Sequence, residues 1–159
     1  MTTRVIGVDP AIRQAGYGVV DVDGDRITYV ECGTFEFDQR ESVEVRLAQL
    51  SADLIEVVDE FGPALAGIEH AHVGKNPQSA LRLAEARGVC TAVFAERGIV
   101  VENYQPSEIK LSATGNGRAN KAQVRAILMR QLRISREPKF DASDALAVAV
   151  CRARRLRGG

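Results

Sequence analysis

The sequence is poor in the residues that bind soft metals or form disulfides. It has two histidines, His70 and His72, and three cysteines that lie far apart, Cys32, Cys90 and Cys151. An odd number of widely spaced cysteines fits neither a disulfide framework nor a zinc cluster, so we expect these residues to be small core side chains. A reducing, cytoplasmic environment is therefore expected.

Long apolar runs and linker segments are also missing from the sequence. No apolar run approaches the ~20 residues of a membrane-spanning helix, and the first residues, MTTRVIG, lead into a strand pattern rather than a signal peptide. We find no internal repeat and no interdomain linker. With 45% hydrophobic residues, the chain predicts a single domain over residues 1–159, with the last few residues as a flexible basic tail and no membrane contact.

Apolar patterns and turn residues predict alternating strands and helices. Residues 4–9 are typical of a buried strand, and Asp23-Gly24-Asp25 indicates a hairpin turn. Gly62-Pro63 and Gly98 each mark the end of a helix. The predicted elements are strands over 4–9, 16–20, 26–37, 65–69 and 99–101, helices over 43–58 and 77–97, and two or three later helices, one of them over 121–132.

This order of elements predicts an α/β fold. Three meandering strands come first, and helices and strands alternate after them, which favours a mixed five-stranded sheet with helices on both faces. In that topology the first and fourth strands can lie parallel and adjacent, so that their last residues share one edge. Open α/β sheets place their ligands at such an edge.

Four carboxylates stand at the ends of apolar segments, where charge is unusual. Asp9 and Glu69 each close an apolar strand, and Asp141 and Asp144 open the stretch DASDALAVAVC. A carboxylate entering a core must be paired, protonated or metal-bound, and no basic residue is adjacent to any of the four. Carboxylate oxygens are hard ligands suited to Mg²⁺ or Mn²⁺. Two such ions can promote phosphodiester hydrolysis.

Each candidate ligand also has a simpler explanation. Asp141 as a helix N-cap, with Asp144 at the third helical position, is an ordinary acidic helix start. An Asp that ends an apolar strand is often a structural or Walker-B-like acid. His70 and His72 are either a metal pair, groove-lining residues or surface residues. Only the combination of four carboxylates, on elements that can meet, favours a metal site.

The formal net charge is zero, but the charge is unevenly distributed. Residues 1–69 hold 5 basic and 14 acidic residues, whereas residues 70–159 hold 16 and 7. The window 110–139 contains one acidic residue, Glu137, and these basic ones: Lys110, Arg118, Lys121, Arg125, Arg130, Arg133, Arg136 and Lys139. This pattern favours either a polyanion-binding surface or a solvated face that the acidic half neutralises.

The chain resembles the RuvC family of crossover (Holliday) junction endodeoxyribonucleases. The segments that carry the resemblance are GVDPAIRQAGYGVV, GIEHAHVGKNPQSALRLAEARG and FDASDALAVAV. The resemblance implies a ribonuclease H-like fold and a homodimer that resolves four-way DNA junctions in recombination and repair. It further implies paired, Mg²⁺-dependent nicks, two ions in each site with Mn²⁺ as a substitute, and work alongside the RuvA–RuvB branch-migration complex.

The resemblance also assigns roles to individual residues. Asp9, Glu69, Asp141 and Asp144 match the family's acidic metal ligands, and two lysines, Lys110 in SEIK and Lys121 in ANKAQV, match basic residues near its scissile phosphate. His72 stands where relatives often carry an aromatic that stacks on a base. We expect the DNA-binding residues to be His72, Lys75, Asn76, Arg118, Lys121, Arg125 and Arg130.

The segment 78–97 predicts how two copies of the chain could meet. Ala80, Ala84, Gly88 and Ala92 are spaced four apart, which gives a ridge of small residues where another helix can approach. The alternative is a helix buried entirely within one subunit.

Two other classes of function remain open at this point. One is an actin-like or sugar-kinase-like ATP binder, which would need two such domains. The other is a junction-binding module without catalysis, in which four carboxylates without metal would repel DNA.

Overall fold

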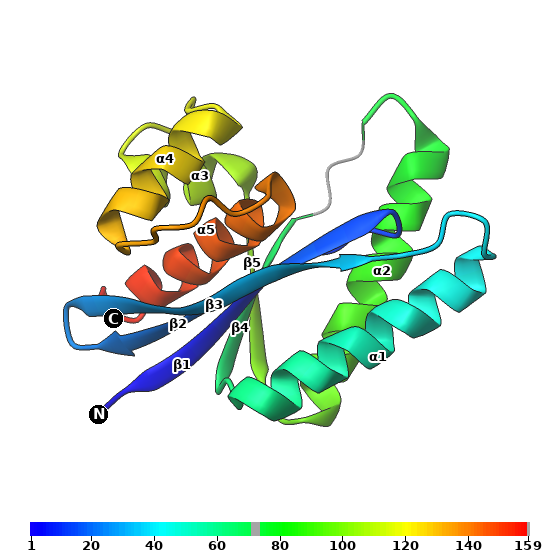
Figure 1. The fold of residues 1–159 in the computed structure, drawn as a ribbon, viewed down its shortest axis with the longest axis horizontal. Helices are drawn as coiled ribbons and strands as arrows, with labels where there is room; N and C mark the ends of the chain where they lie inside the picture. Colours follow the sequence, from blue (N-terminus) through cyan, green and yellow to red (C-terminus); the bar gives the residue numbers. More distant parts are fainter. Residues whose placement is uncertain (71–73, 159) are drawn as a thin grey trace.

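The computed structural model describes residues 1–70 and 74–158 and is built around one sheet in the order β3-β2-β1-β4-β5 (Figure 1). The strands are β1 (Thr3–Asp9), β2 (Gln14–Asp23), β3 (Arg26–Glu36), β4 (Leu65–Glu69) and β5 (Val100–Tyr104). The first three strands pair antiparallel, whereas β4 runs parallel to both β1 and β5. The prediction of a mixed five-stranded sheet with β1 and β4 as parallel neighbours is confirmed.

Helices cover both faces of the sheet, as expected (Figure 1). One side carries α1 (Val43–Phe61) and α2 (Pro77–Glu96), and the other carries α3 (Pro106–Thr114), α4 (Lys121–Gln131) and α5 (Phe140–Arg155). Helix α5 packs directly on β1 and β2, and α3 and α4 pack on α5. The second side is therefore two helices deep, and α5 is its inner layer.

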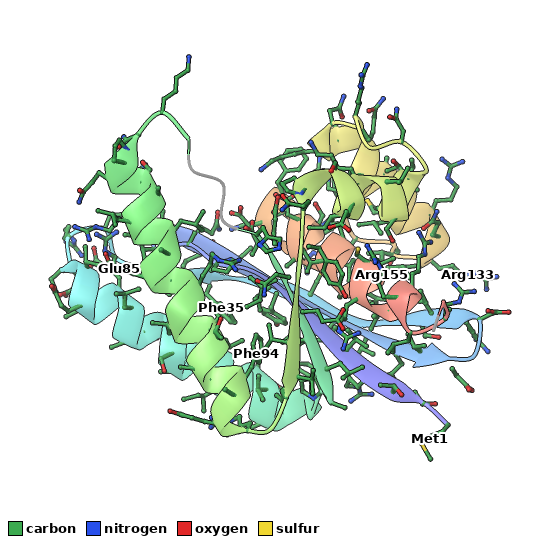
Figure 2. All side chains as sticks on the ribbon, turned by 180° about the vertical axis from the view of Figure 1, so that it is seen from behind. Met1, Phe35, Glu85, Phe94, Arg133 and Arg155 are labelled. Atoms are coloured by element: carbon green, nitrogen blue, oxygen red, sulfur yellow. The ribbon has the colours of Figure 1, made fainter. Side chains whose placement is uncertain are left out.

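Two separate apolar cores hold these layers together. Phe35 and Phe94 belong to the core between the sheet and the α1–α2 pair (Figure 2). Leu146 of α5 anchors the other core, which also takes in Leu128 of α4 and Ile109 of α3. Such close-packed cores fix the relative positions of the elements they join.

Glycines let α5 approach the sheet closely. A Cβ atom at Gly7 would collide with the backbone of Ala145 and Ala149, and one at Gly16 would collide with the backbone of Asp141. A Cβ at Gly18 would meet the α5 backbone in the same way. The start of α5 is thus held against β1 and β2 by backbone-to-backbone contact, which only glycine permits there.

The last strand is longer than the sequence predicted. β5 covers Val100–Tyr104, where apolar residues had predicted 99–101. It is an edge strand, and Val100, Glu102 and Asn103 are exposed. An exposed edge strand has no continuous apolar pattern, so its second half gave no strand signal.

All three cysteines lie in the described part of the chain. Cys90 and Cys151 are buried and Cys32 is half-buried, and all three are free thiols. No helix within residues 1–70 and 74–158 is both long enough and apolar enough to cross a membrane.

Candidate active site

Three of the predicted carboxylates form a tight cluster. One carboxylate oxygen from each of Asp9, Asp141 and Asp144 lies within 4.8 Å of the others. Asp9 arrives at the carboxyl end of β1, and the two other residues arrive from the first turns of α5. Because α5 is pressed onto β1 and β2 at glycines, the cluster position follows directly from the packing of these elements.

Glu69 reaches the same place from the neighbouring strand. Val8 pairs with Ile68 in the parallel β1–β4 ladder, so Asp9 and Glu69 both follow at the same edge. Glu69 lies outside the 4.8 Å cluster, but it lines one cavity of about 230 Å³ together with Asp9 and Asp144.

The lining of this cavity also contains two basic residues. Lys110 of α3 and Lys121, the first residue of α4, both line it. The Lys121 Nζ atom lies 3.0 Å from Oδ2 of Asp144. The cavity therefore combines lysines, which attract an anionic ligand, with carboxylates, which can bind cations.

The explanation of Asp141 as a helix cap is wrong. Helix α5 begins at Phe140, and Lys139 occupies the N-cap position. Asp141 is therefore the second helical residue, and Asp144 is the fifth, beyond the positions where a side chain caps a helix start. Within the described residues, the ion pair of Asp144 is with Lys121 of another helix.

The carboxylates raise one another's pKa. Burial raises the pKa of Asp9 to about 8, with further contributions from Asp144, Asp141 and Glu69 and a partial offset from Lys121. Burial and the charge of Asp144 also raise the pKa of Glu69 and of Asp141. Holding several carboxylates together without a cation costs free energy, and a bound divalent cation would remove that cost.

Arg87 supports Glu69 from behind and was missed in the sequence. Its Nη1 donates to the main-chain carbonyl of Glu69, and its Nη2 donates to Oδ1 of Asn103 at 2.6 Å. The arginine thus ties α2 to the ends of β4 and β5. A signal was present, because Arg87 lies three residues before buried Cys90 and seven before buried Phe94, on the inward stripe of α2.

The remaining DNA-binding candidates differ in their exposure and contacts. Lys75, Arg118 and Arg130 are exposed. Asn76 caps α2, since its Oδ1 accepts from the backbone N–H groups of Gln78 and Ser79. His72 lies outside the described residues.

Arg125 is engaged within the protein. Its guanidinium lies 3.8 Å from the centroid of the Phe140 ring and 3.3 Å from Oε1 of Glu137, and it donates to the carbonyl of Pro138. Only 18% of its side chain is exposed. These contacts tie α4 to the loop that leads into α5.

The small-residue ridge of α2 faces solvent in the single chain. Ala84, Gly88 and Ala92 are exposed and Ala80 is half-buried, while Leu81 on the same helix is 59% exposed. The alternative of a helix buried entirely within one subunit is therefore wrong.

Comparison with known proteins identifies the fold and then the family. A yeast mitochondrial Holliday junction resolvase shares the fold, with a TM-score of 0.67, 16% identity, and 98% of this chain and 82% of that chain covered. The sheet and its flanking helices thus form a ribonuclease H-like fold, as the family resemblance implied. The structure of Thermus thermophilus RuvC in complex with a Holliday junction substrate matches with a TM-score of 0.91 and 27% identity, covering 99% of this chain and 96% of that chain.

The sequence comparisons agree. The family model described as "Crossover junction endodeoxyribonuclease RuvC" matches residues 5–152. A protein of that name from Polynucleobacter asymbioticus is 43% identical over 151 residues, which cover 94% of this chain and 88% of the relative. The chain belongs to the RuvC family of crossover junction endodeoxyribonucleases.

Proposed function

We propose that this protein resolves four-way (Holliday) DNA junctions in recombination and repair, by nicking two strands symmetrically. The observation that carries the proposal is the cavity in which clustered carboxylates face two lysines, in a chain of the RuvC family. We infer that junction DNA is the substrate, because Thermus thermophilus RuvC, which has the same fold and family, forms a complex with a Holliday junction substrate.

We propose Asp9, Glu69, Asp141 and Asp144 as the ligands of Mg²⁺, with two ions in each site and Mn²⁺ as a substitute. Oxygens of Asp9, Asp141 and Asp144 converge, and Glu69 lines the same cavity. Burial and the neighbouring carboxylates raise the pKa of Asp9, which fits a site made for cations. The chemistry that Mg²⁺ supplies in such a site is activation of a water on one side of a phosphodiester and stabilisation of the leaving oxygen on the other.

The two lysines have the complementary role in this proposal. Lys110 and Lys121 would hold the scissile phosphate against the carboxylate wall and neutralise charge that develops on it. Lys121 would exchange its contact with Asp144 for the phosphate. Alanine at either position should therefore slow cleavage more than it weakens junction binding.

Other polar and basic residues supply further DNA contacts in this proposal. We propose phosphate contacts from Lys75, Asn76, Arg118 and Arg130, all exposed. Arg125 can add long-range positive charge, although its direct contacts are internal. We also propose that His72 stacks on a base of the junction.

Resolution by paired cuts needs two active sites, and this chain carries residues for one. We therefore propose a homodimer formed through the exposed ridge of α2, working with the RuvA–RuvB complex in the cytoplasm. We also propose that residues 1–159 act as a single domain.

A gel assay on a synthetic four-way junction tests the proposal. With Mg²⁺ we expect symmetric nicks in two opposite strands, and with EDTA a shifted band without nicks. A shift without nicks under both conditions would indicate a binding module. ATP turnover without junction binding would indicate a kinase-like protein.

A further inference from the structure

A second hollow lies beside the turn that joins β1 to β2, between this turn and helices α1 and α2. It has a volume of about 540 Å³, and its wall includes three arginines from separate parts of the chain: Arg13 of the turn, Arg46 of α1 and Arg82 of α2. Gln39, Gln78 and Ser79 add polar groups, and no carboxylate belongs to the described lining.

Two of the three arginines, Arg13 and Arg46, belong to the acidic half of the chain, residues 1–69. Residues 1–69 hold only 5 basic residues. Arg4 pairs with Asp21 and Arg40 pairs with Asp38, each at 2.8 Å. Arg13 and Arg46, by contrast, form no ion pair within the described residues, and both line the hollow.

The contacts of Arg46 shape the hollow. Its Nη1 donates to the carbonyl of Ile12 and to Oε1 of Gln39, both at 3.0 Å. Its Nε is buried and has no acceptor among the described residues. Arg46 therefore holds the turn in place and contributes a positive charge that the protein leaves without a counter-ion.

The other two arginines are available to a ligand. Arg13 is exposed. Arg82 pairs with Glu85 at 2.6 Å, but both side chains are more than a third exposed, and such surface pairs contribute little to stability. A stronger acceptor can replace the carboxylate of Glu85 at little cost.

Other hollows of the molecule differ in charge. A hollow of about 450 Å³ beside β3 contains Glu31 and Glu137 as well as arginines, and the active-site cavity contains three carboxylates. Uncompensated guanidinium groups are suited to phosphate, whose oxygens they bind in pairs.

The position of the hollow indicates which phosphate it binds. The turn that joins β1 to β2 begins directly after Asp9 of the carboxylate cluster, and its residues Ala11, Ile12 and Arg13 line the hollow. Lys110 and Lys121 lie on the α3–α4 side of the cluster, whereas the hollow lies on the α1–α2 side.

We propose that this arginine hollow, defined by Arg13, Arg46 and Arg82, binds a backbone phosphate of the junction DNA next to the cleaved position. The inference rests on the proposed function. It means that the substrate strand is held on both sides of the active site, by lysines on one side and by arginines on the other.

Junction binding without cleavage tests the inference. We would titrate a fluorescent four-way junction in Ca²⁺ at several salt concentrations with wild type, Arg13→Gln, Arg82→Gln and the double variant. Arg26→Gln is the matched control, because Arg26 is exposed at the far β2–β3 hairpin. Thermal unfolding would verify that every variant is folded.

We expect the double variant to bind about tenfold more weakly and to reduce the slope of log affinity against log salt by about 1 to 2. At protein concentrations below saturation, its single-turnover cleavage rate should fall by about the same factor as its affinity. An affinity and slope equal to those of Arg26→Gln would overturn the inference.

Two further outcomes separate this inference from its foundation and from a rival ligand. Wild type that neither binds nor cuts the junction would overturn the proposed function and this inference with it. Inorganic phosphate that stabilises wild type but not the double variant, with an unchanged salt slope on DNA, would assign the hollow to free anions and overturn the DNA assignment.

Discussion

Helices α2 and α5, which lie on opposite faces of the sheet, differ in how much of their surface is buried. Helix α5 is buried from Ala142 to Ala153 except at Asp144, and it lies on glycines of β1 and β2. Helix α2 buries only Ala86, Cys90, Val93 and Phe94, and a Cβ added at its Gly88 would meet no atom within 4 Å.

This difference in burial indicates different roles for the two helices. Close packing around α5 fixes two carboxylates against Asp9 and tolerates little change. The open face of α2 contributes less to the single chain and is free for a partner, while Arg87 on its inner face still contacts the backbone of Glu69. Helix α5 therefore positions the site, and α2 carries the face through which we propose that the dimer forms.

Removing a carboxylate charge should have the largest effect. We expect Asp9→Asn, Glu69→Gln, Asp141→Asn and Asp144→Asn each to lower the cleavage rate by about 1000-fold while junction binding stays, because each weakens cation binding. Gel assays of cleavage and binding would measure both, with Glu56→Gln on α1 as the control. Near-normal cleavage in any one variant would remove that residue from the site.

A side chain added between α5 and the sheet should come next. We expect Gly18→Val to destabilise the protein by about 3 kcal/mol or more, because the added atoms meet the α5 backbone. Gly88→Ala on α2 should instead be neutral or stabilise by up to about 1 kcal/mol. Urea unfolding would measure both, and equal effects would contradict the contrast between the helices.

A charge on the open face of α2 should affect assembly and leave the fold intact. We expect Ala84→Glu to weaken the proposed dimer by at least about tenfold, because two carboxylates would meet across the interface. Sedimentation at micromolar concentration would measure it, with Ala48→Glu on the exposed side of α1 as the control. A monomeric wild type that still makes paired cuts in one binding event would refute the preformed dimer.

Arg87 connects helix α2 to the active site through its hydrogen bond to the main chain of Glu69. We expect Arg87→Met to lower the cleavage rate at saturating junction by about tenfold and to raise the Mg²⁺ concentration needed for half-maximal rate, because Glu69 loses its backbone support. Arg87→Lys should restore part of both effects. Unchanged Mg²⁺ dependence in a folded Arg87→Met variant would restrict Arg87 to a structural role.

The smallest effect should appear in the stability of the metal-free protein. The pKa of Asp9 is raised to about 8 in the fold from an ordinary value of 3.8, so the folded state binds an extra proton between these values. Stability should therefore fall as the pH rises from about 4 to about 8. Asp9→Asn should flatten this profile and raise Tm at pH 8 by about 2–4 °C; a profile identical to wild type would show that Asp9 does not carry it.

Sequence patterns were sufficient for the fold because each buried strand and helix has its own apolar period. They also located Asp9 and Glu69, since both carboxylates directly close buried strands. The alternative of Asp141 as a helix cap is the part that was wrong, because helix α5 starts two residues earlier than a cap at this position would require.

Features that depend on tertiary contact were beyond the sequence. The charge of Arg125 predicts a DNA contact, and the sequence gives no sign that the Phe140 ring and Glu137 engage its guanidinium. Arg13, Arg46 and Arg82 meet only because the β1–β2 turn, α1 and α2 converge. No local period in the sequence connects residues so far apart.

Direct titration of the metal-free protein with Mn²⁺, followed by electron paramagnetic resonance, tests the central claim that packing of α5 on β1 creates a divalent-cation site. Wild type should take up Mn²⁺ saturably, and Mg²⁺ should compete for it. Asp9→Asn and Asp144→Asn should each weaken uptake by at least about tenfold, whereas Glu56→Gln should not. Equal Mn²⁺ binding by wild type and both aspartate variants would contradict the account.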